Sequence, residues 1–275
     1  MINPWLKWFK SRVDSNTNAN ILVIGRPGIG KSWTSLSLAV SASQILGTPF
    51  DVEKQCVFSI KDLVDLINGG TMVPGSVIVY DEAGIDADAQ KWASIAVRGL
   101  KWLMETYRHR RYIVIFTTPY PQFFMSAGRV LMDAEFEIVG RNDSKGLVSV
   151  KPFLREYNPR YDKVYFKFLR VQTDKGSRRI KRIVVSKPPL MVRRAYERKK
   201  TEFTTWLYET KIAPMVSGMS PSDKDSANVR RGAYCKSCEY RWRPQRSEGQ
   251  TSKCSKCGSK NTVWDDALPV TIVDA

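Results

Sequence analysis

One stretch decides the fold: Gly25-Arg26-Pro27-Gly28-Ile29-Gly30-Lys31-Ser32. It matches the phosphate-loop pattern G-x-x-x-x-G-K-[ST] at every fixed position. The residues before it, 20–24, are short, mainly apolar and β-branched, as in a buried parallel strand. The residues after it, 33–40, predict a helix. Strand, glycine loop and helix in this order are the context that the pattern requires, which favours a phosphate loop over a chance glycine turn.

This pattern predicts a nucleotide site. The glycines let the backbone N–H groups face a phosphate chain at the positive end of a helix. Lys31 is then expected to reach the outer phosphates, and Ser32 to hold Mg²⁺. The residues expected to bind ATP are Gly25, Arg26, Pro27, Gly28, Ile29, Gly30, Lys31, Ser32, Trp33 and Asp81.

A second stretch, residues 76–83, contains an apolar strand that ends in Asp81-Glu82. This is the Walker B pattern, in which Asp81 holds Mg²⁺ through its water shell. Glu82 orients and deprotonates the attacking water. An ordinary strand followed by a polar turn is the alternative. The position after a complete phosphate loop favours the Walker B interpretation.

A third buried strand, residues 112–118, ends in the hydroxyls of Thr117 and Thr118. A polar side chain at this position senses the γ-phosphate in ATPases of this type, and Thr118 is the preferred choice. A threonine that only caps the strand remains an open alternative. The expected catalytic residues are therefore Lys31, Glu82 and Thr118. Five residues are candidates for an arginine presented to a neighbouring subunit's nucleotide: Arg98, Arg108, Arg110, Arg111 and Arg129.

Positive charge is concentrated behind this core. The chain of 275 residues has a formal net charge of +17, and residues 141–200 carry 19 basic but only 5 acidic side chains. Such a region predicts a polyanionic partner, with nucleic acid first and an anionic membrane second, or else a solvated face.

No apolar run approaches the roughly 18 residues of a membrane span, and no signal peptide is evident. Residues 1–13 are amphipathic and are expected to pack on their own domain, with membrane contact as an open alternative.

Two cysteine pairs near the C-terminus, Cys235/Cys238 and Cys254/Cys257, have the spacing C-x₂-C-x₁₅-C-x₂-C. This spacing is typical of a zinc site in which four thiolates surround Zn²⁺. The pairs predict a zinc ribbon whose role is DNA contact, protein contact or structural capping. Unpaired cysteines together with a metal site suit a reducing cytoplasm, which is the host's cytoplasm if the protein is viral.

These patterns predict an α/β chain made of several parts. The expected core is RecA-like, with a mainly parallel sheet, and a basic hairpin and helix follow it. In the hairpin, residues 178–186 are expected to pair back on residues 164–171; the basic helix is expected over residues 190–212. The predicted divisions are residues 1–19 (amphipathic segment), 20–172 (ATPase core), 173–216 (hairpin and helix), 217–231 (linker), 232–266 (zinc ribbon) and 267–275 (tail).

From Ile21 to about Val171 the chain resembles the FtsK/HerA group of P-loop ATPases, within the viral and plasmid branch that includes Zot-like and DNA-packaging proteins. The resemblance rests on GRPGIGKS (25–32), VIVYDEAG (77–84) and YRHRRYIVIFTTPYP (107–121). It implies a homo-oligomeric ring and ATP-driven movement of double-stranded DNA, with a capsid or secretion-apparatus protein as a further partner. The chain differs from the group in having Thr117-Thr118 where glutamine is frequent, and in lacking the membrane span of many Zot-like proteins.

Three functions follow from these observations. The first is a Mg²⁺-dependent ATPase that translocates or packages DNA. The second is an ATP-dependent switch of the AAA+ type that acts in replication or assembly. The third is a DNA-binding zinc-ribbon regulator with a vestigial ATP site, which the intact Lys31, Asp81 and Glu82 disfavour.

Overall fold

The computed structural model contains two compact units, Met1–Phe203 and Thr204–Ala275. The described residues are 3–83, 99, 102, 104, 106–123, 129–174, 176–217, 232–238, 241–242, 253–254, 256–260 and 262–265. The sequence also predicts a long helical region over residues 86–108, with Trp102 among its core contacts. This region lies mostly outside the described residues, as do Arg98, the linker 218–231 and the tail 267–275.

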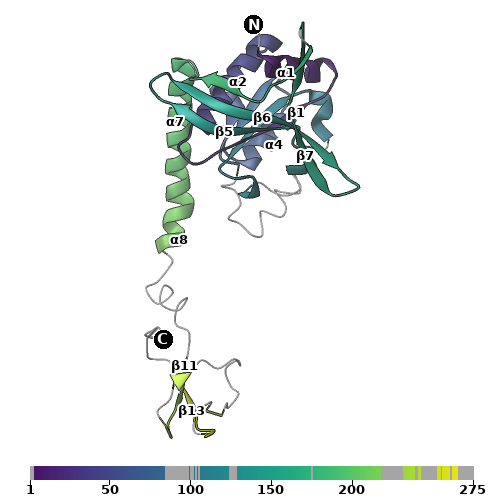
Figure 1. The fold of residues 1–275 in the computed structure, drawn as a ribbon. Coiled ribbons are helices and arrows are strands. Elements are labelled where there is room, and N and C mark those ends of the chain that lie inside the picture. The colour runs from purple at the N-terminus through teal and green to yellow at the C-terminus, as the bar shows by residue number, and fades with distance from the viewer. Residues whose placement is uncertain are drawn as a thin grey trace. The chain divides into compact units, whose positions relative to one another are not determined.

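An eight-stranded sheet forms the centre of the first unit (Figure 1), in the order β10-β6-β5-β1-β4-β3-β2, with β7 paired to β6. The five strands from β2 to β5 in this order run parallel, whereas β6, β7 and β10 pair antiparallel. The strands are β1 (Ala19–Ile24), β2 (Cys56–Val57), β3 (Val77–Tyr80), β4 (Ile113–Thr118), β5 (Ala134–Asn142), β6 (Leu147–Asn158), β7 (Lys163–Lys167) and β10 (Ile183–Ser186). The expected α/β class with a mainly parallel sheet is confirmed.

Helices cover both faces of this sheet because side chains alternate along each buried strand. Ile21 and Val23 of β1 face one core cluster, which includes buried residues of α1 (Pro4–Asp14), α2 (Lys31–Leu46) and α7 (Leu190–Leu207). Leu22 faces the other cluster, which includes α4 (Ile60–Asn68). Three short elements precede or follow strands of this sheet: α3 (Val52–Gln55) before β2, η2 (Tyr107–Arg110) before β4 and η3 (Pro121–Phe123) after β4.

The N-terminal segment packs on its own domain, as expected. Trp5, Phe9 and Val13 recur at helical spacing on one face of α1 and are buried in the core. The Trp5 ring meets Phe136 of β5 edge-on, with centroids 4.8 Å apart. Arg12 pairs with Asp133 at 2.7 Å. The apolar face of this segment is therefore used within the fold.

The predicted hairpin is partly wrong. A short hairpin does form, from β8 (Arg170–Thr173) and β9 (Gly176–Arg179). Residues 183–186 do not continue it, because β10 joins the main sheet beside β6, with Ile183 opposite Val150. Burial of Ile183 and Val185 in the first core cluster explains this placement.

Trp102, expected in the core, is 63% exposed.

The basic helix is also divided differently from the prediction. After α7 the backbone forms a π-helical turn, η4 (Tyr208–Ile212), and then α8 (Ala213–Ser217). The second unit also contains a small antiparallel sheet of β11 (Gly232–Cys235), β12 (Arg241–Trp242) and β13 (Thr262–Asp265), in the order β12-β11-β13. Among the described residues, no helix combines the length and apolar character needed to span a membrane.

Candidate functional site: a phosphate loop closed by a helix

The phosphate loop links β1 to α2 through backbone conformations that suit glycine. Gly30, the N-cap of α2, has φ 103°, in the left-handed region that other residues rarely adopt. A Cβ atom on Gly25 would lie 2.9 Å from Cγ2 of Ile29. The Lys31 ammonium donates to the carbonyl oxygens of Gly25, at 2.8 Å, and Arg26, at 3.2 Å. These two hydrogen bonds hold the Lys31 side chain against the start of the loop, and α2 begins at Lys31 itself.

Asp81 lies at the carboxyl end of β3 and is fully buried. Because β3 and β4 are parallel neighbours with Tyr80 opposite Phe116, Thr117 comes beside Asp81. The Thr117 hydroxyl donates to Oδ1 of Asp81 at 2.5 Å and accepts from the backbone N–H of Glu82 at 2.9 Å. The Ser32 hydroxyl lies 3.0 Å and 3.1 Å from the two oxygens of Asp81. The sheet thus brings the two predicted magnesium residues into contact.

The two threonines at the end of β4 have different partners. The sequence favoured Thr118 as the polar residue facing the phosphates, but its hydroxyl donates to the carbonyl oxygen of Tyr120 at 3.1 Å. Thr117 is the residue that contacts Asp81. Alternation along the strand separates the two side chains, although both line the cavity described below.

Glu82 follows Asp81 in a left-handed backbone conformation, with φ 55°. Such conformations are costly for residues other than glycine and cluster at functional sites. Its carboxylate accepts from the ammonium of Lys200 at 2.6 Å. The predicted catalytic carboxylate is therefore held by a residue that sequence reasoning did not associate with the site.

Helix α7 closes this site with two residues one turn apart. The Tyr196 hydroxyl donates to Oδ2 of Asp81 at 2.5 Å, and the Lys200 ammonium lies 3.2 Å from the same oxygen. Glu197 accepts from the indole N–H of Trp33 at 3.1 Å. The sequence contains no signal for these contacts, because 115 and 119 residues separate Tyr196 and Lys200 from Asp81.

The electrostatics of the site follow from its burial. Burial lowers the pKa of Lys31, against the opposing effect of Asp81 and Glu82. Burial also acts to lower the pKa of Lys200, but Asp81 and Glu82 outweigh it and raise that pKa above its ordinary value. Burial and the Asp81 carboxylate raise the pKa of Tyr196. Both lysines therefore face the same pair of carboxylates.

A cavity of about 700 Å³ lies over these groups. Its size is in the range of small-molecule sites, roughly 300–1,000 Å³. Arg141 of β5, which the sequence analysis missed, also lines the cavity and donates to the carbonyl oxygen of Gly28 at 2.7 Å. The predicted residues that line the cavity are Pro27, Gly28, Gly30, Lys31, Ser32, Trp33, Asp81, Glu82 and Thr118. The candidate arginines Arg108, Arg110, Arg111 and Arg129 are not among its lining residues.

The groups in this cavity fit a magnesium nucleotide. Mg²⁺ prefers oxygen ligands and carboxylates, and the Ser32 hydroxyl and Asp81 carboxylate supply both side by side. Lys31 and the N-terminus of α2 supply positive potential for phosphates. Ser32 and Asp81 would hold the metal, whose charge would neutralise phosphate oxygens.

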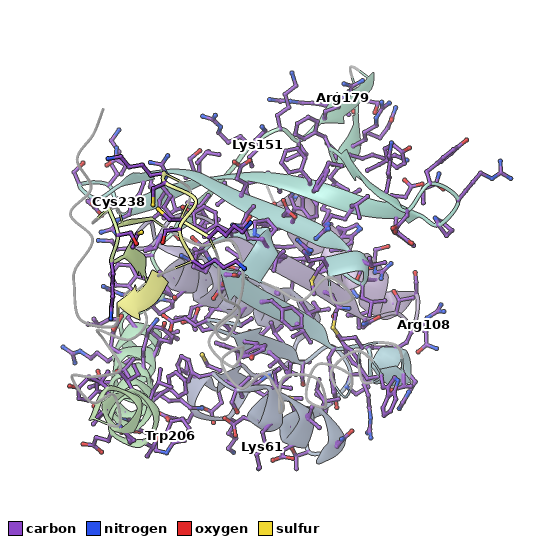
Figure 2. The ribbon with its side chains drawn as sticks, turned by 90° about the horizontal axis from the view of Figure 1, so that it is seen from below. Lys61, Arg108, Lys151, Arg179, Trp206 and Cys238 are labelled. Atoms are coloured by element: carbon purple, nitrogen blue, oxygen red, sulfur yellow. The ribbon has the colours of Figure 1, made fainter. Side chains whose placement is uncertain are left out.

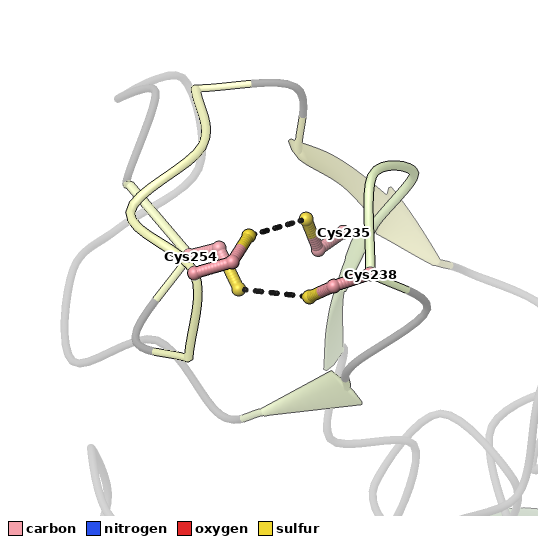
Figure 3. A group of neighbouring side chains, drawn as sticks. Cys235, Cys238 and Cys254 are labelled. Carbon is pink, nitrogen blue, oxygen red and sulfur yellow. Dashed lines mark hydrogen bonds between the residues drawn. The ribbon is translucent and has the colours of Figure 1, made fainter.

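A second candidate site lies in the unit Thr204–Ala275. The sulfur atoms of Cys235, Cys238, Cys254 and Cys257 all lie within 4.8 Å of one another. Figure 3 shows the cluster between the two cysteine loops; the sulfurs are 3.7 Å apart for Cys235–Cys257 and 3.6 Å apart for Cys238–Cys254. Four sulfurs at the Zn–S distance in a tetrahedron would be separated by about 3.8 Å. The cluster can bind zinc.

One thiol of this cluster is already poised to ionise. Burial acts to raise the pKa of Cys235, but backbone hydrogen bonds from Ser237 and Cys238 and contacts with neighbouring thiols lower it to about 6. The thiolate is the form that binds metals. The geometry and the ionisation of Cys235 both suit a metal site.

No family model matches the chain, and no curated protein matches it. Among solved structures, it is similar to the N-terminal domain of zonular occludens toxin from Neisseria meningitidis, with 15% identity over 56% of this chain and 95% of that one, and a TM-score of 0.34. It is also similar to B204, the DNA-packaging ATPase from Sulfolobus Turreted Icosahedral Virus, with 14% identity over 55% of this chain and 98% of that one (TM-score 0.34). A RuvB variant from Thermotoga maritima shares 15% identity over 50% of this chain and 44% of that one (TM-score 0.35).

Replacing Thr117 by valine tests the packing around Asp81. The Thr117→Val variant removes one donor from a buried carboxylate and the acceptor of the Glu82 N–H. Because unsatisfied buried polar groups are costly, we expect a loss of about 1–3 kcal/mol in the free energy of unfolding. Urea denaturation measures it. Thr118→Val is the matched control, with a smaller expected loss, and an equal or larger loss in that variant would contradict the assignment.

Proposed function

We propose that the protein is a Mg²⁺-dependent ATPase that moves or packages double-stranded DNA as a ring of identical subunits. One observation carries the ATPase part: Lys31, Ser32, Asp81 and Glu82 meet in one cavity at the carboxyl ends of β1 and β3, the two parallel strands that flank β4. Ligands bind at this edge in open α/β sheets. In this proposal Lys31 holds the outer phosphates, and Glu82 orients a water molecule and accepts its proton.

The β8–β9 hairpin supports the DNA part of the proposal. The hairpin and the residues directly after it line a groove with four exposed cations, Arg178, Arg179, Lys181 and Arg182, and one acidic residue, Asp174. Within the described part of the chain, no ion pair joins these four residues to an acidic side chain. Exposed cations of this kind suit contact with the phosphates of a nucleic acid.

We also propose that the four-cysteine cluster binds Zn²⁺ as a ribbon that supports the small sheet of β11, β12 and β13. A segment this short has no room for a core of its own, so the metal would supply most of its folding free energy.

The decisive experiment measures ATP hydrolysis by the zinc-loaded protein with no DNA, with double-stranded DNA and with single-stranded DNA, at two salt concentrations. We expect Mg²⁺-dependent hydrolysis that double-stranded DNA stimulates and that salt weakens, since phosphate contacts release counterions. Glu82→Gln is expected to keep ATP binding and lose turnover. Slow hydrolysis that DNA does not change would favour an ATP-dependent switch instead.

A charge-reversal pair locates the DNA contact. We expect the double variant Arg178→Glu and Arg179→Glu to lose DNA stimulation and to reduce the salt slope of DNA binding by roughly one unit per lost phosphate contact. Figure 2 shows Lys151 and Arg179 on one side of the unit Met1–Phe203 and Lys61, on α4, on the opposite side. Lys61→Glu is therefore the control for the single variant Arg179→Glu, which changes the net charge by the same amount. Equal losses in these two single variants would mean that only net charge matters.

Metal analysis tests the cysteine cluster. We expect one zinc ion per chain, and loss of that ion on replacing Cys254 by serine, because a thiolate is exchanged for a weak ligand. Elemental analysis of the purified proteins measures the stoichiometry. Cys56→Ser, at the buried cysteine outside the cluster, is the control and should retain zinc. Equal zinc contents in the wild type and Cys254→Ser would contradict the site.

A further inference from the structure

We propose that Tyr196 and Lys200 are positioning residues of the nucleotide site: Tyr196 binds the carboxylate of Asp81, and Lys200 binds the carboxylates of Asp81 and Glu82. We further propose that binding of Mg²⁺ with a nucleotide displaces Tyr196 and Lys200 from these carboxylates. Before the metal binds, the positive charge of the Lys200 ammonium compensates the negative charges of Asp81 and Glu82. This inference rests on the proposed nucleotide function and adds a part of the chain to which the phosphate-loop and Walker B patterns assign no role.

The hydrogen bonds of Asp81 are the first argument. The single hydroxyl proton of Ser32 is shared between Oδ1 and Oδ2. Oδ1 also accepts from Thr117, and Oδ2 also accepts from Tyr196 and Lys200, so four donors surround the carboxylate. A carboxylate offers about four acceptor positions, so protein donors saturate this one. A metal-bound water that uses Asp81 must therefore replace one of the existing donors.

The donors differ in how easily they can leave. Ser32 is itself the expected metal ligand, and Thr117 also holds the N–H of Glu82 from within the central sheet. Tyr196 and Lys200 come from a surface helix and both use Oδ2. The two α7 contacts are therefore the ones that can be exchanged without disturbing the strands.

Charge gives the second argument. The Lys200 ammonium lies 3.2 Å from Asp81 and 2.6 Å from Glu82, and its side chain is only 24% exposed. A divalent cation held by Asp81 would repel this ammonium, and repulsion between charges a few ångströms apart is strong in a partly buried site. Because Lys200 and the metal would compete for Asp81, Lys200 moves away when Mg²⁺ enters.

The anchoring of α7 provides the third argument. Of all its residues, only Tyr196 is buried, and the hydroxyl of that residue ends on Asp81. Val192, Ala195 and Phe203 are only partly buried against the first core cluster. Phe203 stacks on Phe58 with centroids 4.8 Å apart, Lys199 donates to the carbonyl oxygen of Cys56 at 2.7 Å, and Arg193 lies 5.6 Å from the Trp33 ring. A helix with one fully buried side chain can shift at lower cost than a helix whose whole apolar face is buried.

The experiment measures how much Mg²⁺ the closed site requires. Full-length, zinc-loaded protein is titrated with Mg²⁺ at a fixed concentration of AMP-PNP, a non-hydrolysable ATP analogue, and the bound analogue is measured directly. In Lys200→Met we expect the Mg²⁺ concentration for half-maximal binding to fall about tenfold, the effect of losing one charge-assisted contact. Tyr196→Phe should lower it by less. Arg194→Met, which removes an exposed charge of the same helix, should leave it unchanged.

Cys56 supplies a second readout that needs no variant. This cysteine is fully buried, and its carbonyl oxygen is held by Lys199 of α7. We expect alkylation of Cys56 in the zinc-loaded protein, identified by peptide mass spectrometry, to be faster with Mg²⁺ and AMP-PNP than in buffer without either. If Lys200→Met does not fold, this comparison in the wild type decides the question.

The outcomes separate the two proposals. If the wild type does not bind AMP-PNP at any Mg²⁺ concentration, the nucleotide function and this inference both fail. If AMP-PNP binds but Lys200→Met needs the same or more Mg²⁺ than the wild type, the nucleotide function stands. Lys200 is then a phosphate-binding group or an inert contact, and the displacement of α7 is overturned. Unchanged alkylation of Cys56 also overturns it.

Discussion

The buried carboxylate of Asp81 is the constraint on which the rest of the nucleotide site depends. A charge removed from water persists only where donors and opposite charges surround it. Asp81 meets this condition because its carboxylate is contacted by Ser32 of α2, Thr117 of β4 and Lys200 of α7. The parallel order of β1, β4 and β3 places the three strand ends at the same edge of the sheet. The contacts that stabilise this edge of the sheet are therefore the same contacts that position the groups of the nucleotide site.

Local patterns account for the parts of the site that the sequence could predict. The phosphate loop, the Asp81-Glu82 pair and the cysteine pairs each place their chemistry within a few consecutive residues, so spacing alone identifies them. The burial of Trp5, Phe9 and Val13 was predictable for a similar reason, since their spacing matches one face of a helix. In each case the physical requirement acts over a turn or two of chain.

Contacts between distant residues could not be predicted in this way. Tyr196 and Lys200 lie 115 and 119 residues from Asp81, and no spacing rule links them. Which of Thr117 and Thr118 contacts Asp81 depends on the register of β4 against β3, and a shift of one residue would exchange them. Strand β10 has the same alternation whether it extends a hairpin or joins the main sheet, so its partner became clear only from the burial of Ile183 and Val185.

Contacts between distant residues also reduce the share of the positive charge in residues 141–200 that is available to a polyanionic partner. Several of these basic side chains are used within the fold, bonded to carbonyl oxygens or paired with carboxylates: Arg141, Arg155, Lys167, Arg198, Lys199 and Lys200. The charge count therefore overstates the surface offered to a polyanion. The cations of the β8–β9 hairpin are exposed and have no such carboxylate partners among the described residues. One basic region thus has two uses: α7 compensates the buried acids of the nucleotide site, and the hairpin presents its charge to solvent.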